Sequence, residues 1–197
     1  MDYAAVLRML LSGDPLRLRA LNVVASLALP DCWIGAGFVR DAAWDHLHGH
    51  RATPITGDVD VLWYEAESFQ VDRDRQIEQE LCYRMPDLPW SVKNQARMHV
   101  RNGDRPYTSV ADAMRHWPET ATAVAARCKA PDSKTPDSIE INAPYGLDDL
   151  FGLRLRPTPA FRTGKLSIFE DRVSSKGWLE RYPLLAARGR EHSDRAA

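Results

Sequence analysis

Cysteine is scarce in this sequence, which has only three, Cys32, Cys82 and Cys128, placed far apart. No two of them have the Cys-x-x-Cys spacing of a redox motif or a zinc site, and no paired disulfide framework is indicated. Isolated cysteines of this kind are usually buried thiols in a reducing compartment. We therefore expect free cysteines and a cytoplasmic location.

The sequence also lacks an excess of charge of either sign, since 26 Lys and Arg stand against 27 Asp and Glu. Proteins that bind long nucleic acids without sequence specificity usually carry a basic excess, because phosphate contacts supply most of their affinity. Duplex DNA is therefore not expected as a partner. A nucleotide, a small molecule or a local contact on a nucleic acid is left open.

Long hydrophobic runs are absent as well. No stretch reaches about 18 apolar residues, so no membrane-spanning helix is predicted. Asp2, Arg8 and Asp14 interrupt the N-terminal apolar run, so no signal peptide is expected. The 197 residues, 44% of them hydrophobic, suit one folded domain. We predict that this domain covers residues 1–186 and that residues 187–197 form a disordered tail.

Hydrophobic periodicity predicts interleaved helices and strands, and therefore a mixed α+β architecture. Helices are expected at 2–11, 14–28, 38–48, 77–85, 109–117, 118–128 and 165–182. Strands are expected at 32–34, 58–63, 90–100, 139–141 and 153–156. In a strand over 90–100, Lys93, Arg97 and His99 would share one face, because side chains alternate between the faces of a sheet.

Two aspartates, Asp58 and Asp60, alternate with Val59 and Val61 in one of these strands. Aspartate is depleted in strands, and the i, i+2 spacing places both carboxylates on the same face. Like charges this close destabilise the fold unless a cation neutralises them. Mg²⁺ or Mn²⁺ is suited to that role, because these ions prefer oxygen ligands and bind substrate phosphates at the same time. The pair therefore predicts a metal site for phosphoryl transfer.

A glycine-containing turn, Gly35-Ala36-Gly37, precedes the aspartates and joins a predicted strand to a predicted helix. Backbone N–H groups at such a junction favour phosphate, and glycine permits close approach of a ligand. Arg40, in the first turn of the helix, could contact a phosphate or pair with a carboxylate. The turn and the aspartates together indicate a site for a polyphosphate and a metal ion.

Residues 33–64 resemble the catalytic core of the polymerase-beta-type nucleotidyltransferases, in which Gly-x-Val-Arg-Asp precedes a helix and an Asp-x-Asp strand. The local likeness is to the tRNA CCA-adding and poly(A) polymerase branch, where the turn has two glycines and this chain has Ala36 in place of the first. The chain is too short for the helical neck and tail of that branch, and no matching nucleotide-selecting motif is found. CCA addition is therefore not expected. The stretches 90–99, 117–127 and 143–159 resemble a bacterial family of nucleotidyltransferase-like proteins of unassigned substrate.

The resemblance implies a nucleotidyltransferase-type mixed β-sheet with helices packed on it. It also implies a Mg²⁺-dependent transfer of a nucleoside monophosphate from an NTP to an unknown acceptor, which could be a small molecule, RNA or protein. Asp58 and Asp60 would hold the metal, and Gly35 and Gly37 would let the backbone cradle the phosphates. A third carboxylate usually comes from a neighbouring strand, and Glu140 is the candidate for this catalytic and metal-binding role.

Other roles are less well defined. Asn94 rivals Glu140: it could hold an aspartate of the pair by a hydrogen bond, or it could cap a backbone group. Lys93, Arg97 and His99 could bind the triphosphate, or they could form a solvated strand face. The main alternative for the whole chain is a catalytically silent module of the same fold that binds a nucleotide or a protein. A phosphohydrolase with the same metal pair is a weaker alternative.

Overall fold

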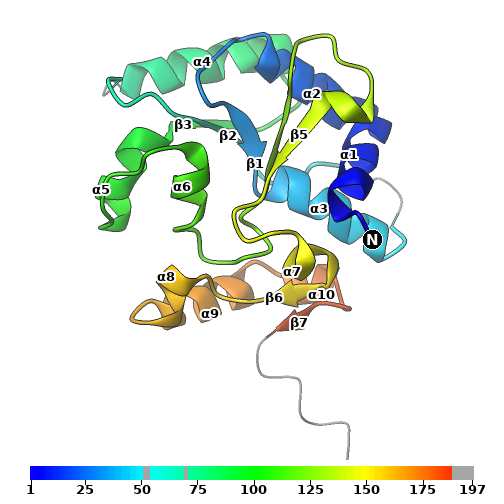
Figure 1. Ribbon diagram of the computed structural model, residues 1–197, viewed down its shortest axis with the longest axis vertical. Coiled ribbons are helices and arrows are strands. Elements are labelled where there is room, and N and C mark those ends of the chain that lie inside the picture. The colour runs from blue at the N-terminus through cyan, green and yellow to red at the C-terminus, as the bar shows by residue number, and fades with distance from the viewer. Residues whose placement is uncertain (51–53, 69–70, 188–197) are drawn as a thin grey trace, which may run out of the picture.

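A mixed five-stranded sheet forms the centre of the computed structural model, which describes residues 1–50, 54–68 and 71–187 (Figure 1). Its strands are β1 (Trp33–Gly35), β2 (Val59–Trp63), β3 (Trp90–Asn94), β4 (Ala125–Cys128) and β5 (Ile139–Asn142). They lie in the order β3-β2-β1-β4-β5. The β2–β3 pair is parallel, and the β1–β2, β1–β4 and β4–β5 pairs are antiparallel.

One face of the sheet packs against the first four helices. These are α1 (Tyr3–Gly13), α2 (Pro15–Ala25), α3 (Gly37–Leu47) and α4 (Val71–Arg84). Alternate strand residues such as Ile34 and Val61 are fully buried in this main core. Asp14 begins α2, since its side chain accepts hydrogen bonds from the backbone N–H groups of Leu16 and Arg17. This face has the hydrophobic alternation that the sequence predicts for a sheet with one covered side.

The opposite face of the sheet carries a smaller core and the polar residues of interest. Trp33, Leu62 and Ala125 point to this face and pack against Val110 and Met114 of α6 (Val110–Met114). The remaining elements are η1 (Gln95–Arg97), α5 (Met98–Asn102), η2 (Pro136–Ser138), α7 (Asp148–Phe151), β6 (Arg154–Leu155), α8 (Pro159–Arg162), α9 (Leu166–Ser175), α10 (Trp178–Arg181) and β7 (Ala186–Ala187). Figure 1 shows α8, α9 and α10 together at the end of the molecule below α6 and α7.

The predicted α+β architecture is confirmed, but the predicted strand over 90–100 is wrong beyond Asn94. There the chain leaves the sheet and continues as η1 and α5. The cause is local, because the Asn94 side chain accepts a hydrogen bond of 3.0 Å from the backbone N–H of Ala96 and so caps the helical turn. Lys93, Arg97 and His99 therefore do not share a strand face.

Two predicted helices also differ from the structure. Residues 118–128 do not form a helix, since their second half is β4, which is paired on both sides with β1 and β5. Strand pairing there overrides the helix propensity of the alanines. The helix predicted over 165–182 is divided into α9 and α10 at Gly177, whose φ of +63° is a left-handed conformation.

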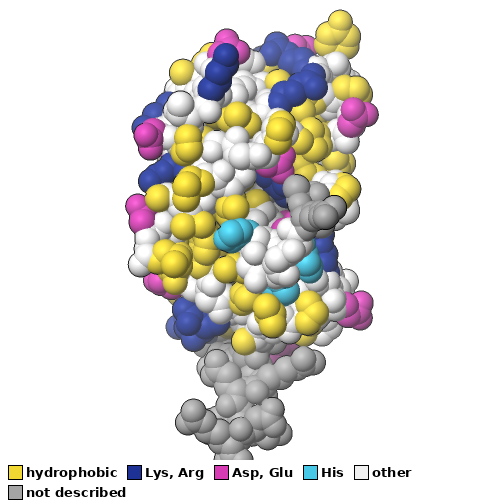
Figure 2. Space-filling view, turned by 90° about the vertical axis from the view of Figure 1, so that its right-hand side faces the viewer, with side chains coloured by type: hydrophobic (Ala, Val, Ile, Leu, Met, Phe, Trp, Pro, Cys, Tyr) yellow, Lys and Arg dark blue, Asp and Glu magenta, His cyan; other side chains and the backbone are white. Residues whose placement is uncertain are grey.

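Cys32, Cys82 and Cys128 are free thiols, as expected; Cys32 and Cys128 are buried, whereas Cys82 is exposed. None of the helices in the described part of the chain has the length and hydropathy of a membrane-spanning segment. On the face shown in Figure 2, Lys and Arg side chains are dispersed among hydrophobic and neutral ones, with no continuous basic stripe among the described side chains. Residues 188–197 of the predicted tail lie outside the described residues.

Candidate active site

The turn between β1 and α3 has an unusual backbone conformation. Ala36 precedes α3 with φ 53° and ψ −127°, a conformation that glycine adopts far more readily than alanine. Hydrogen bonds hold it there: the N–H of Ala36 donates to the carbonyl of Val124 at 3.0 Å, and its carbonyl accepts from Arg40 N at 2.9 Å. Ala36 stands where the resembling branch has a glycine.

The two glycines of the turn have different surroundings. A Cβ added to Gly35 would lie 2.7 Å from Leu62 Cδ1 and 3.2 Å from Trp117 Cη2, so Gly35 makes room for packing on the sheet. A Cβ added to Gly37 would meet only Arg40 Nη2 at 3.4 Å and Asp41 Oδ2 at 3.8 Å. Gly37 lines the groove described below, whereas Gly35 lines neither of its two lobes.

The aspartate pair lies beside this turn. Asp60 is in register with Gly35 on the adjacent strand, and Asp58 comes just before β2 and is exposed. Burial, followed by the nearby charge of Asp58, raises the pKa of Asp60 to about 6. The two carboxylates line the same groove with Ala36, so the structure brings the pair and the turn together.

A two-lobed groove surrounds the aspartates. The lobe beside α3, here the α3 lobe, has a volume of about 290 Å³ and is lined by residues that include Gly37, Arg40 and Arg181. The lobe beside β3, here the β3 lobe, has a volume of about 660 Å³ and includes Lys93 and Trp117. Residues that line both lobes are Ala36, Asp58, Asp60, Arg172 and Lys176. The acids therefore lie where the two lobes meet.

Arg40 forms part of the wall of the α3 lobe. Its Nη2 lies 2.7 Å from Asp41 Oδ1, and its Nη1 donates to Thr122 Oγ1 at 3.3 Å. The guanidinium carbon lies 4.8 Å from the ring centre of Trp44 and 4.6 Å from that of Trp178. Of the two roles predicted for Arg40, the structure contains the carboxylate pair.

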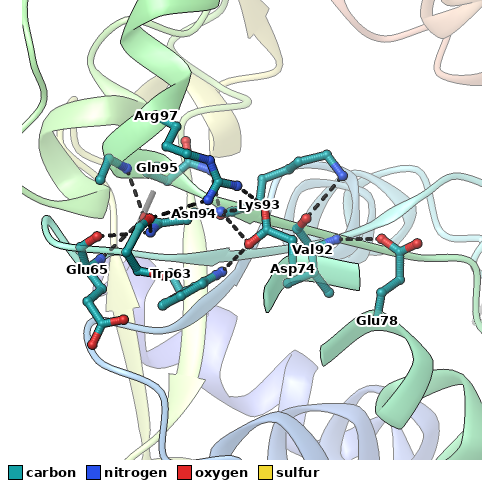
Figure 3. A network of polar contacts seen from close by, with 11 residues as sticks. Trp63, Glu65, Asp74, Glu78, Val92, Lys93, Asn94, Gln95 and Arg97 are labelled. Carbon is teal, nitrogen blue, oxygen red and sulfur yellow. Dashed lines mark hydrogen bonds and ion pairs between the residues drawn. The ribbon is translucent and has the colours of Figure 1, made fainter. Parts of the chain in front are cut away.

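Arg97 and Asn94 belong to a buried network away from the groove (Figure 3). Asp74 of α4 forms an ion pair with Arg97 and accepts hydrogen bonds from Trp63 Nε1 at 2.9 Å and Asn94 N at 3.1 Å. Asn94 Nδ2 donates to the carbonyl of Glu65 at 2.9 Å. Arg97 lines neither lobe of the groove. Its guanidinium instead neutralises the buried carboxylate of Asp74. Asn94 caps backbone groups, the second of its two predicted roles.

Lys93 is the one member of the predicted triphosphate-binding trio that lines the groove in the described residues. It lies in the β3 lobe, its charge lowers the pKa of Asp60, and its Nζ donates to the carbonyl of Val92 at 3.0 Å. A role for Lys93 in binding phosphate stays a prediction.

Glu140 is not close to the aspartates. It lies on β5, which β1 and β4 separate from β2, so about 14 Å of sheet lies between the two strands at the usual spacing. Its Oε2 lies 2.6 Å from Arg127 Nη2 on β4. The register of the sheet thus overturns the prediction that Glu140 supplies the third carboxylate. The residue beside Asp60 on β3 is Ser91, and no cluster of three potential metal-binding side chains occurs in the described residues.

Comparison with known proteins decides the family. A nucleotidyltransferase family model matches residues 22–187. The chain belongs to this nucleotidyltransferase family. The sequence matches none of the curated proteins.

Two solved structures are among those that resemble this nucleotidyltransferase. An NMR structure that reveals a CCA-adding enzyme head domain is 30% identical with a TM-score of 0.77, covering 91% of this chain and 94% of that one. A tRNA-processing enzyme in an apo form is 16% identical with a TM-score of 0.50, covering 86% of this chain and 45% of that one. The second likeness concerns the fold alone, and the chain spans less than half of that enzyme.

Sequence reasoning missed the basic residues that the C-terminal helices of this nucleotidyltransferase bring to the groove. Arg172 of α9 and the following Lys176 line both lobes, and Lys165 and Ile168 line the β3 lobe. These four residues recur at helical spacing and form one stripe along α9 and its two caps, next to the side on which Phe169 is buried. The helical recurrence of three basic residues is the signal that could have indicated a ligand-facing side.

Proposed function

We propose that this nucleotidyltransferase transfers a nucleoside monophosphate from an NTP to an acceptor hydroxyl, with Mg²⁺ held by Asp58 and Asp60. The observation that carries the proposal is the aspartate pair at the junction of two lobes, beside the β1–α3 turn. Because the chain belongs to a nucleotidyltransferase family, one lobe can hold the NTP that donates the nucleotide, and the other can hold the acceptor.

The donor set of the pair fits Mg²⁺ or Mn²⁺. Two carboxylates on one side of β2 supply part of an oxygen shell that substrate phosphates and water complete. Burial and the charge of Asp58 both disfavour the ionised form of Asp60, so a cation relieves a real electrostatic cost. When bound, the metal ion would neutralise charge on the phosphates during in-line displacement.

The α3 lobe is the proposed site of the triphosphate. The N-terminus of α3 opens at Gly37 in this lobe, and unpaired backbone N–H groups of a first helical turn favour phosphate. The larger β3 lobe would hold the acceptor. The acceptor oxygen forms a bond to the α-phosphorus, the bond from that phosphorus to the bridging oxygen breaks, pyrophosphate leaves, and the hydroxyl proton passes to water. The chain contributes by positioning both reactants.

The acceptor is a separate question. The similar protein with a CCA-adding enzyme head domain makes the 3′ hydroxyl of an RNA the first acceptor to test. The β3 lobe combines Lys93 and Arg101 with the aromatic rings of Trp117 and Phe161, a combination that suits the phosphates and bases of a single strand. Small molecules and proteins with a free hydroxyl are the next acceptors to test.

A catalytically silent nucleotide-binding module is the second candidate. It is favoured by the position of Ser91, which occupies the β3 site in register with Asp60 where a carboxylate could complete the metal shell. Glu140 does not substitute for it, because it lies on β5, three strands away from β2, and pairs with Arg127. A silent module would bind nucleotide and Mg²⁺ in the groove without releasing pyrophosphate.

Pyrophosphate release tests the proposal. The wild-type protein is incubated with each NTP, Mg²⁺ or Mn²⁺, and either RNA or a cell metabolite extract as acceptor. Release should fall by about a hundredfold or more in Asp58→Asn and Asp60→Asn, since metal-assisted charge neutralisation is worth several kcal/mol. Asp137→Asn, an exposed carboxylate in η2, is the matched control and should match the wild type.

Each outcome separates the candidates. Release that is unchanged by both aspartate substitutions contradicts the proposed transfer. Nucleotide binding without release supports the silent module, and release of orthophosphate in place of pyrophosphate indicates a phosphohydrolase.

A further inference from the structure

Two cations of the C-terminal segment reach the aspartate pair. Arg172 lies in the last turn of α9, and Lys176 is its C-terminal cap. Both line both lobes of the groove, as do Asp58 and Asp60. Their charges also lower the pKa of Asp60 against the effect of burial, so their fields reach that carboxylate. A ligand bound at Asp60 would therefore be within reach of both cations.

Three other arginines, Arg17, Arg40 and Arg181, line the α3 lobe and are more fully engaged than Arg172. Arg181 donates to Thr56 Oγ1 at 3.0 Å and lies 3.6 Å from Asp41 Oδ2. The guanidinium of Arg40 uses Nε, Nη1 and Nη2 in contacts with Asp41 and Thr122. The guanidinium of Arg17 donates through Nε to the Phe38 carbonyl at 3.0 Å and pairs through Nη1 with Asp14. These contacts fix the wall of the lobe, so these guanidinium groups are poorly placed to take up a new anion.

Arg172 is held differently. Its Nε lies 2.8 Å from Oε1 of Glu119, a side chain that is 0% exposed. Its guanidinium carbon lies 5.5 Å from the ring centre of Trp178. An arginine has five N–H donors, and its closest approach to Glu119 is through Nε. The terminal nitrogens can thus serve an anion in the groove, while the buried carboxylate limits the freedom of the side chain.

Lys176 completes the arrangement. It follows Arg172 by one helical turn, so the two side chains lie on the same side of α9. Lys176 is exposed, which suits a flexible cation that closes on a ligand. The guanidinium of Arg172 and the ammonium of Lys176 together offer two neighbouring positive charges. A polyphosphate carries negative charge on neighbouring phosphate groups, so the two side chains are complementary to it.

We propose that Arg172 and Lys176 bind the β- and γ-phosphates of the nucleoside triphosphate, and that Glu119 is the positioning residue for Arg172. This inference rests on one part of the proposed function, namely that the groove binds an NTP. It therefore holds both for an active transferase and for a catalytically silent module. It also implies that the groove binds inorganic pyrophosphate, the product that would leave through the same contacts.

Binding measurements on the full chain test the proposal. Calorimetry with Mg²⁺ present compares the tightest of the four NTPs, inorganic pyrophosphate and the corresponding nucleoside monophosphate. Lys176→Ala removes an exposed side chain. Glu119→Gln combined with Arg172→Gln removes both charges of the buried pair, which avoids leaving an uncompensated carboxylate in the core. Arg162→Ala, an exposed arginine of α8 outside both lobes, is the control.

We expect binding of the NTP and of pyrophosphate to weaken about tenfold in each test variant, the usual effect of one lost charge-assisted contact. Binding of the monophosphate should stay within about twofold of the wild type, because its single phosphate lies at the α position. Circular dichroism and unfolding midpoints confirm that each variant is folded. Arg172→Lys should recover part of the lost affinity, since it restores the charge without the planar fork.

Three results would overturn the inference. The first is that both test variants bind pyrophosphate as tightly as the wild type. The second is that the variants lose affinity for the NTP and for the monophosphate equally. The third is that the wild-type chain binds neither NTP nor pyrophosphate. The proposed transfer fails separately, when the wild type binds NTP but releases no pyrophosphate with any acceptor. In that case, a loss of NTP binding in the variants still supports the roles of Arg172 and Lys176.

Discussion

Replacement of Asp60 by asparagine should stabilise the metal-free protein. The ordinary pKa of an aspartate is 3.8, and burial with the nearby charge of Asp58 raises the pKa of Asp60 to about 6. A raised pKa in the folded state means that the fold binds the proton more tightly than the unfolded chain does. The stabilising effect of that proton is complete below the unfolded pKa and is lost as the pH rises through the folded one.

The size of the effect follows from the shift. At pH 7.5, a shift of two pKa units lowers the free energy of unfolding by about 3 kcal/mol relative to a group with no shift. At pH 4.5, where fewer of the unfolded chains are ionised at this residue, the same shift lowers it by about 1 kcal/mol. Asparagine has nearly the shape of the protonated acid and has no charge to bury. In the absence of metal, Asp60→Asn should therefore exceed the wild type in free energy of unfolding by these amounts.

Urea unfolding in EDTA at pH 7.5 and pH 4.5 measures the difference, with Asp137→Asn as a control of equal charge change. Addition of Mg²⁺ with NTP should then stabilise the wild type and leave Asp60→Asn nearly unchanged, since ligands that bind only the fold shift its stability. If Asp60→Asn is no more stable than the wild type at pH 7.5, or if its advantage is the same at both pH values, the electrostatic argument is refuted.

Further substitutions test the remaining structural arguments. Arg97→Ala should destabilise the fold by about 3–5 kcal/mol in urea unfolding, because it leaves a buried carboxylate unpaired. Ala36→Gly should raise the unfolding free energy by about 1 kcal/mol, because it relieves an unfavourable positive φ. Gly35→Ala should cost about 1–3 kcal/mol by crowding, whereas Gly37→Ala should be tolerated in the same assay. Ser91→Asp should tighten Mg²⁺ binding about tenfold in calorimetry, because it adds an oxygen ligand beside the pair.

The parts of the site that the sequence predicts are those that one short segment encodes. The β1–α3 turn and Asp60 lie close in the chain, and alternation along β2 sets the direction of its side chains without reference to other strands. A resemblance over residues 33–64 then links the pattern to a fold. The alternation needs only local geometry, whereas the closeness of the pair to the turn also depends on the antiparallel pairing of β1 with β2.

The errors arise where register and long-range pairing decide. Glu140 has the right alternation in its own strand, but nothing in that strand tells which neighbours separate it from β2. Arg97 follows an alternating run, yet Asn94 ends the strand and Asp74 pairs with the guanidinium from another element. Arg172 carries no motif at all, since its position depends on how the C-terminal helices pack. Strand order and helix docking are properties of the whole chain.

Three unfavourable features of the fold lie beside one groove, and their coincidence there is an argument for ligand binding, although positive φ also occurs elsewhere, at Ala28 and Leu153. Ala36 adopts a backbone conformation suited to glycine, Asp60 is partly buried beside a like charge, and Glu119 is fully buried with its carboxylate facing Arg172. Each of these opposes folding by an amount of the order of 1–3 kcal/mol. Burial raises the pKa of Glu119 as well, so the charged pair is retained at a cost that a neutral pair would avoid. Structural groups such as Asp74 are by contrast satisfied by several partners. A metal ion at the aspartates and a polyphosphate at Arg172 would offset these costs together, which explains why strain, buried charge and open volume coincide at the junction of the two lobes.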